Sequence, residues 1–210
     1  ATGAGKSTLI NLIPRFYDVT EGQVLVDGVD VREVKLSDLR DRIGLVPQKG
    51  VLFSGTIETN IAYAGNVPDS ETVRWAAKIA QADGFINEKP DGYDSEIAQG
   101  GTNVSGGQRQ RLAIARAVAK RPEIYIFDDS FSALDYATDR ALREALQEVA
   151  AESTVLIVAQ RISTVLNADR IIVLDGGRVA GMGTHKELME NCEEYRQIAL
   201  SQLSAEEAGR

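Results

Sequence analysis

The sequence begins Ala1-Thr2-Gly3-Ala4-Gly5-Lys6-Ser7-Thr8, a glycine-rich turn followed at once by the apolar residues of an expected helix. Glycines let successive backbone N–H groups point at one anion, and the N-terminus of a helix adds a favourable field. The stretch matches most of the pattern G-x-x-x-x-G-K-[ST], whose first glycine would precede Ala1. We therefore expect a phosphate-binding loop in a chain that continues upstream. The alternative is an ordinary glycine-rich helix start with a surface lysine.

Short apolar segments alternate with amphipathic ones along most of the chain. We expect strands at 23–26, 43–46, 124–127, 154–159 and 170–174, and helices at 9–13, 136–150 and 162–167. This alternation predicts a parallel sheet covered by helices on both faces. Between Thr56 and Lys120 the pattern becomes helical, with amphipathic stretches at 69–81 and 106–120. We interpret this block as a helical lobe inserted into the sheet.

Composition narrows the range of functions. The 210 residues carry a formal net charge of −8, which argues against a nucleic-acid partner because phosphate backbones attract an excess of Lys and Arg. The single cysteine, Cys192, excludes an internal disulfide. No apolar run approaches the roughly 18 residues of a membrane helix. We expect one soluble domain over residues 1–210.

Two adjacent carboxylates, Asp128 and Asp129, follow the apolar segment 124–127. Such a pair at the end of a buried strand is costly unless a cation lies nearby. Downstream of a phosphate-binding loop, this cation would be Mg²⁺, with Ser7 as a ligand and Asp128 acting through water or another ligand. Lys6 would reach the β- and γ-phosphates. The alternative is an acidic turn after a strand, which is common.

A second candidate anion-binding helix start is Ser105-Gly106-Gly107-Gln108. It offers a hydroxyl and several free N–H groups with no side chains in the way. One nucleotide rarely needs two such termini from one chain. A dimer in which each chain contributes one terminus to each nucleotide would use both.

These motifs, in this order, resemble the ABC ATPase family across essentially the whole chain. Residues 2–8 resemble its Walker A motif, Gln48 the Q-loop, 104–108 the signature, Asp128 Walker B and 132–135 the D-loop. Segments 52–57 and 183–188 resemble exporter-type members. The resemblance implies an α/β fold: a P-loop NTPase core with a mostly parallel sheet, a small antiparallel β region and an inserted helical subdomain at about 56–120.

The resemblance also implies ATP and Mg²⁺ as cofactors. In this family two domains pair head to tail, and each ATP lies on the Walker motifs of one chain under the signature of the other. The residues implied to bind nucleotide are Thr2, Gly3, Ala4, Gly5, Lys6, Ser7, Thr8, Gln48, Ser105, Gly106, Gly107, Gln108 and Asp135. Those implied to hold Mg²⁺ are Ser7, Gln48 and Asp128. The implied partners are a second nucleotide-binding domain and the transmembrane domain of the same exporter, at the cytoplasmic face of the cell membrane.

Two positions depart from the family pattern, and both affect hydrolysis. Asp129 stands where the family usually has the Glu that acts on the attacking water, which withdraws the carboxylate by about 1.5 Å, and misplacing a catalytic group by about 1 Å can cost on the order of a hundredfold. Gln160 stands where the family usually has His; it can donate a hydrogen bond to a γ-phosphate but cannot carry an imidazolium charge. With Lys6, these are the candidate catalytic residues.

The binding groups Lys6, Ser7, Gln48 and Asp128 remain, as in the degenerate half of heterodimeric ABC exporters. We therefore expect a chain that holds ATP, hydrolyses it slowly and completes the site of a non-identical partner. Three alternatives stay open: tolerated variation in an ordinary motor, a regulatory module without hydrolysis, and a soluble ABC protein acting on ribosomes or DNA. The acidic charge and the single signature count against the last.

Overall fold

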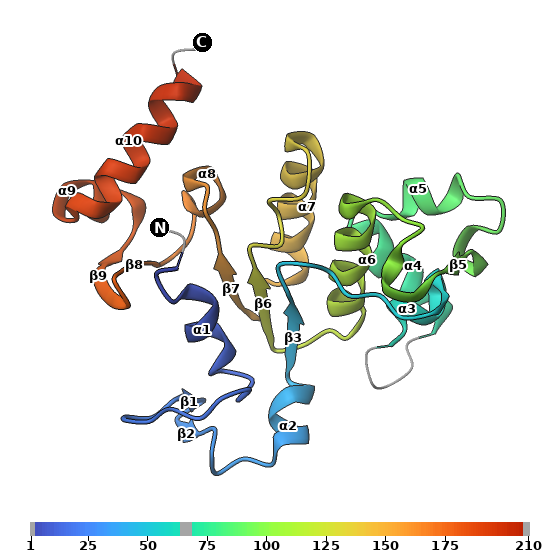
Figure 1. The fold of residues 1–210 in the computed structure, drawn as a ribbon, viewed down its shortest axis with the longest axis horizontal. Helices are drawn as coiled ribbons and strands as arrows, with labels where there is room; N and C mark the ends of the chain where they lie inside the picture. Colours follow the sequence, from blue (N-terminus) through green and yellow to red (C-terminus); the bar gives the residue numbers. More distant parts are fainter. Residues whose placement is uncertain (1–2, 64–68, 208–210) are drawn as a thin grey trace.

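The computed structural model describes residues 3–63 and 69–207, and its centre is a parallel sheet of three strands (Figure 1). The order is β3 (Ile43–Val46), β6 (Ile124–Asp128), β7 (Thr154–Val158). In the register, Val46 lies beside Phe127, and Phe127 lies beside Ile157. β3 and β6 are almost continuously apolar, as expected for strands covered on both faces. The parallel arrangement predicted for these three segments is confirmed.

The helical region between β3 and β6 packs against one face of this sheet. It contains α3 (Ile57–Ile61), α4 (Ser70–Ile79), α5 (Asp83–Asn87) and α6 (Gly106–Ala119), drawn from teal to green in Figure 1. The short 3-10 helices η1 (Gly92–Asp94) and η2 (Gln99–Gly101) and the antiparallel pair β4 (Gly55–Thr56) and β5 (Glu96–Ile97) connect them. Ile61, Leu112 and Ile114 share one buried apolar cluster with Tyr125 and Phe127 of β6. This shared cluster joins the helices to the sheet.

A second cluster covers the opposite face of the sheet. Ile10 of α1 (Lys6–Asn11) and Leu39 of α2 (Leu36–Asp41) pack there against Ile126 of β6. The hairpin of β1 (Leu25–Val26) and β2 (Val29–Asp30) joins the same cluster through Val26. The sequence predicted the strand at 23–26 with its turn at 27–28, and the strand proves to be two residues long.

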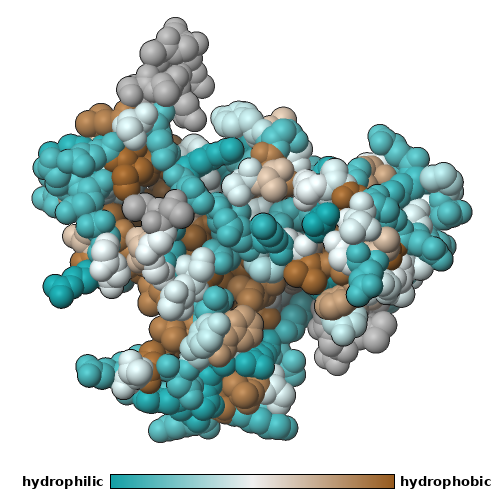
Figure 2. Space-filling view, viewed as in Figure 1, coloured by the Kyte–Doolittle hydropathy of each residue, from teal (hydrophilic) through white to brown (hydrophobic). Residues whose placement is uncertain are grey.

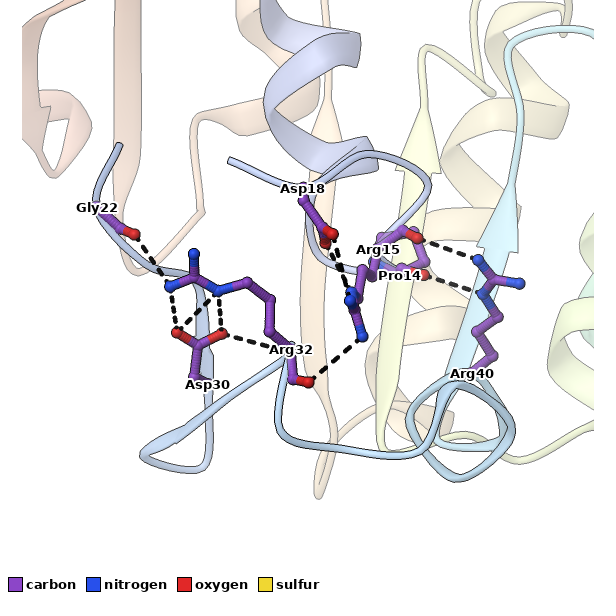
Figure 3. A network of polar contacts seen from close by, with 7 residues as sticks. All are labelled: Pro14, Arg15, Asp18, Gly22, Asp30, Arg32 and Arg40. Carbon is purple, nitrogen blue, oxygen red and sulfur yellow. Dashed lines mark hydrogen bonds and ion pairs between the residues drawn. The ribbon is translucent and has the colours of Figure 1, made fainter. Parts of the chain in front are cut away.

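Arginine side chains fasten this part of the chain together (Figure 3). Arg32 donates to both carboxylate oxygens of Asp30 and to the Gly22 carbonyl. Arg15 is paired with Asp18. From α2, Arg40 donates to the carbonyls of Pro14 and Arg15, in the turn that follows α1. The position of α1 is therefore fixed from its C-terminal end.

The C-terminal part of the chain forms its own apolar cluster. The elements around this cluster are α8 (Ile162–Val165), β8 (Ile171–Asp175), β9 (Arg178–Gly183), α9 (His185–Asn191) and α10 (Glu193–Glu207). Ile162, Val173, Leu188 and Tyr195 belong to the cluster. The preceding helix, α7 (Tyr136–Val149), packs instead in the cluster of the helical region through Leu142 and Leu146. His185 starts α9, and its Nδ1 lies 2.8 Å from the Tyr195 hydroxyl.

One expectation is wrong: the segment predicted at 170–174 does not extend the parallel sheet. Within the described residues, β8 pairs with β9 in an antiparallel ladder and with no strand of the central sheet. β8 joins β9 through the two-residue turn Gly176-Gly177, and this hairpin supplies the hydrogen-bonding partner of β8. A cavity of about 500 Å³ is lined by residues of both β7 and β8. Val155 of β7 and Ile172 of β8 are 40% and 50% exposed in consequence.

The surface reflects this arrangement. On the face shown in Figure 2, brown apolar side chains gather toward the middle and teal hydrophilic ones cover most of the outer parts. Among the described helices, none combines the length and the apolar composition needed to cross a bilayer.

Candidate functional site

The glycine-rich turn has the backbone that its sequence requires. Gly3 and Gly5 adopt φ values of 84° and 91°, a left-handed region that favours glycine. Gly5 is followed at once by α1, and in the part of the chain that the structure describes no side chain caps this helix start. The first N–H groups of an α-helix have no partner within the helix and are the groups with which helix starts bind anions. Thr2 of the predicted loop lies outside the described residues.

Ser7 and Asp128 lie together although 121 positions separate them in sequence. The Ser7 hydroxyl donates a hydrogen bond of 3.0 Å to Asp128 Oδ1. With its proton directed at the carboxylate, the Ser7 oxygen keeps lone pairs for a cation. Mg²⁺ prefers such hard oxygen ligands and is commonly held by one or two carboxylates together with phosphate oxygens. The residues present thus fit a Mg²⁺ ion bound by the Ser7 hydroxyl, and Asp128 would orient that hydroxyl.

The described residues hold no cluster of three or more His, Cys, Asp or Glu side chains able to bind a metal by themselves. A Mg²⁺ ion here would complete its coordination with water molecules and the oxygens of a phosphate ligand. Bound in that way, the ion would neutralise charge on the phosphates.

Asp129 is the meeting point of three strand ends. Its Oδ2 accepts a hydrogen bond of 3.1 Å from Gln48 Nε2 and one of 2.7 Å from Gln160 Nε2. These side chains follow β3, β6 and β7, so they meet where the carboxyl ends of parallel strands are adjacent. Asp129 is 8% exposed and has a φ of 48°, which is uncommon for a residue other than glycine.

The backbone around Asp129 is held in place by neighbouring strands. Its N–H donates to the Val158 carbonyl at 3.0 Å, and the buried Ser130 hydroxyl donates to the Val46 carbonyl at 2.9 Å. The unusual conformation is thus imposed by bonds on both sides. Lys6 and Gln160 line the same cavity of about 500 Å³, and Gln160 and Asp129 line a second cavity of about 240 Å³.

Gln110 is a polar residue of this region that the sequence analysis did not identify. It lies inside α6, 2% exposed, and its amide accepts from Gly50 N–H at 2.9 Å and donates to the Pro47 carbonyl at 3.1 Å. The amide therefore forms hydrogen bonds with the backbone on both sides of Gln48. A glutamine among the apolar residues of a helix was the available signal, but nothing local showed what it would contact.

The second predicted anion-binding terminus starts α6. Ser105 and Gln108 form a capping box, in which the Ser105 hydroxyl accepts from Gln108 N–H and the Gln108 side chain accepts from Ser105 N–H. Gly107 lies so close to residues 133–134 that an added Cβ would stand 3.4 Å from the Ala133 carbonyl oxygen. Gly106 has open space at the same position.

Asp135 caps the next helix, α7, by accepting from Thr138 N–H and from the Thr138 hydroxyl. The Thr138 hydrogen bonds lower the pKa of the Asp135 carboxyl, which keeps it ionised. Figure 1 shows α1 and α6 on opposite sides of the three central strands. The structure therefore does not bring the two predicted anion-binding termini together within one chain.

Comparison with known proteins supplies independent information. The sequence profile of the family described as "ABC transporter" matches residues 1–132. An uncharacterized ABC transporter ATP-binding protein of Mycobacterium tuberculosis is 52% identical over all of this chain and 36% of its own length. A candidate multidrug export ATP-binding/permease protein of Staphylococcus aureus is 46% identical over 94% of this chain and 34% of its own.

A solved structure agrees in fold. A bacterial Atm1-family ABC exporter with ATP bound superimposes with a TM-score of 0.94 at 42% identity, covering 97% of this chain and 36% of the exporter chain. The match includes the α/β P-loop core with its parallel sheet and small antiparallel sheets. The chain thus spans about a third of the length of these relatives.

Proposed function

The chain belongs to the ABC transporter family as one of its ATP-binding domains, and from this premise we propose that it is the motor domain of an exporter whose own ATP site hydrolyses slowly. The relatives that combine an ATP-binding and a permease part, and the Atm1-family exporter, support the export role. The proposed unit is residues 1–210, with a helical subdomain at about 56–120. It would work at the cytoplasmic face of a membrane, joined to a transmembrane domain.

Each group of the site has a proposed task. The loop Thr2–Thr8 and Lys6 would bind the phosphates of ATP, Ser7 would bind Mg²⁺, and Asp128 would orient Ser7. Gln48, which donates to Asp129, would be a further Mg²⁺ ligand. The signature residues Ser105, Gly106, Gly107 and Gln108, with Asp135 nearby, serve the ATP of a second, non-identical nucleotide-binding domain. The separation of α1 from α6 supports this division (Figure 1).

The observation that carries the proposal is the arrangement around Asp129. A carboxylate that activates water needs an oxygen free to accept the proton or hydrogen bond of that water. Here Oδ2 already accepts from two amides, Gln48 and Gln160, which leaves Oδ1 as the oxygen for a water, and neither amide can take up a proton at neutral pH. Combined with the short reach of an aspartate, this arrangement favours retention of ATP over its hydrolysis.

The test is ATP turnover by the full-length transporter with its natural partner, comparing wild type with Asp129→Asn. We expect turnover within about twofold of wild type, because the partner's site supplies most of it. ATP should remain trapped at this site in both proteins. A hundredfold loss, the size expected for removal of a working catalytic group, would mean that Asp129 is a catalytic base and that the site is not degenerate.

Two further variants sharpen this test. Glu123→Gln makes the same carboxylate-to-amide change at the exposed residue just before β6, away from the site, and should leave turnover unchanged. The double variant Asp129→Glu with Gln160→His restores the residues usual in the family, and we expect it to shorten the lifetime of trapped ATP. An unchanged lifetime would show that other residues make hydrolysis slow.

A further inference from the structure

The side chain of Gln202 reaches from α10 to the segment that carries Gln160. Its Oε1 accepts from Ile162 N–H at 2.7 Å, and its Nε2 donates to the Gln160 carbonyl at 2.9 Å. One amide thus pairs with the acceptor and the donor of residues two positions apart, as a neighbouring β-strand would. The link spans 42 residues of sequence and joins the C-terminal helix to the segment 159–161 between β7 and α8.

Two other contacts hold the residues that directly follow this segment. Ile162, 5% exposed, packs in the C-terminal apolar cluster with Tyr195 and Ala199 of α10. From α7, Arg143 donates to the Ser163 carbonyl at 3.2 Å, while the buried Asp139 carboxylate holds the same guanidinium. The backbone after Gln160 is therefore anchored from α7 and from α10. The amide of Gln202 is the contact that reaches Gln160 itself.

A continuous chain of hydrogen bonds results. It runs from Gln202 on α10 to the backbone of Gln160, and from the Gln160 side chain to Asp129 Oδ2 at 2.7 Å. We propose that Gln202 is a positioning residue: it fixes the backbone of Gln160 and couples the C-terminal helix to the ATP site. This inference rests on the proposed function, in which the Gln160 amide occupies Oδ2 of Asp129 at the ATP site. A shift of about 1 Å at a reacting centre changes rates by up to about a hundredfold. Loss of the hydrogen bond that fixes the Gln160 backbone should therefore have a measurable effect at the ATP site.

The experiment uses the full-length transporter with its partner and three variants. Gln202→Met keeps the length of the side chain and removes both hydrogen bonds. Gln202→Glu keeps the acceptor for Ile162 N–H and loses the donor to Gln160. Gln197→Met is the matched control, because Gln197 lies on the same helix, is exposed, and donates to Glu193 one turn away. Hydrogen exchange at residue 162, release of bound MgATP from this site, and the thermal midpoint are measured for each.

For Gln202→Met we expect amide exchange at Ile162 to be about three- to tenfold faster, the factor that loss of one hydrogen bond gives. MgATP release from this site should change by a similar factor. Gln202→Glu should exchange like wild type at Ile162 and yet alter release as the Met variant does, because the lost donor is the group that holds Gln160. Gln197→Met should match wild type in both measurements.

To distinguish positioning of Gln160 from a merely structural role of Gln202, the effect of Gln202→Met is also measured in a protein that carries Gln160→Ala. If Gln202 acts through Gln160, then Gln202→Met has no further effect on MgATP release in that background. An equal effect with and without the Gln160 side chain, or wild-type release in Gln202→Met, overturns the proposal. These outcomes are independent of the degenerate-site test: a collapse of turnover in Asp129→Asn would refute slow hydrolysis but leave the coupling between Gln202 and Gln160 measurable.

Discussion

Side-chain amides are the residue-scale feature that connects this site to its surroundings. Gln110 satisfies Gly50 N–H and the Pro47 carbonyl, and Gln48, between those two residues, reaches Asp129. A buried backbone group without a partner costs about 1–3 kcal/mol. Gln110 therefore contributes to stability and to the position of Gln48 through the same two hydrogen bonds.

Replacing Gln110 by Met should lower the free energy of unfolding by about 2–4 kcal/mol, because the side chain keeps its shape and two backbone groups lose their partner. For a domain of this size each kcal/mol corresponds to roughly 2–4 °C, so the thermal midpoint should fall by about 4–16 °C. Gln147→Met, on the exposed side of α7, is the control and should change the midpoint by less than about 2 °C. Equal midpoints for both variants would contradict this role of Gln110.

Helix caps are the element-scale feature that separates structure from function. α6 and α9 each begin with a capping box, formed by Ser105 with Gln108 and by Thr184 with Glu187. The two boxes satisfy the same backbone groups by the same geometry. Of the two, the proposed function assigns a ligand, the ATP of the partner domain, to the box at the start of α6 alone.

Ser105→Ala and Thr184→Ala should each cost about 1 kcal/mol of stability, because each removes the side-chain acceptor of an N-cap. ATP turnover by the assembled transporter should fall for Ser105→Ala and stay near wild type for Thr184→Ala. Thermal midpoints and steady-state ATP turnover measured on both variants check this. If the two variants lose turnover equally, the loss reflects stability and the signature role of Ser105 is wrong.

Secondary structure was predictable at this scale. The helix at 136–150 buries one face, and its apolar residues recur in the sequence at helical spacing. The strand at 43–46 is buried along almost its whole length, and its sequence is a continuous apolar run. The sheet to which a strand belongs was not. β8 has the apolar residues of a parallel strand, yet it pairs with β9 across the C-terminal cluster. Strand pairing depends on which backbone lies alongside, and local sequence does not encode that.

Surface carboxylates are the charge feature of the molecule as a whole. Hydrogen bonds hold the pKa of several of them below the ordinary value, and the donor is Arg15, Arg32 or a group at a helix start. The carboxylates concerned are Asp18, Asp30, Asp69, Asp135 and Glu187. The Arg32 side chain lowers the pKa of Asp30 furthest, from 3.8 to about 2. Four of the five are exposed, so solvent screens their contributions, whereas the Asp30 side chain is 12% exposed.

Stability should therefore decrease as the solution is acidified. A carboxylate whose pKa is lower in the folded state stabilises the fold above its unfolded pKa, and this contribution is lost as the pH falls through the folded pKa. For Asp30 that window runs from 3.8 down to about 2. Thermal midpoints measured across this range should fall, and the Asp30→Asn variant should fall less steeply. An identical slope for this variant would show that Asp30 is not protected by Arg32.

The sequence by itself determined the class of fold and the kind of ligand chemistry. The local backbone conformation is specified by the glycines at 3 and 5 before Lys6, and the local charge by the carboxylates after the strand at 124–127. Both features depend only on residues that are neighbours in the sequence. The tertiary structure alone decided the contacts: the Ser7 hydroxyl on Asp128, two amides on Asp129, and Gln202 on the Gln160 backbone. The physical reason is that these partners lie 31 to 121 positions apart, so the order of the strands and the packing of the helices set their distances.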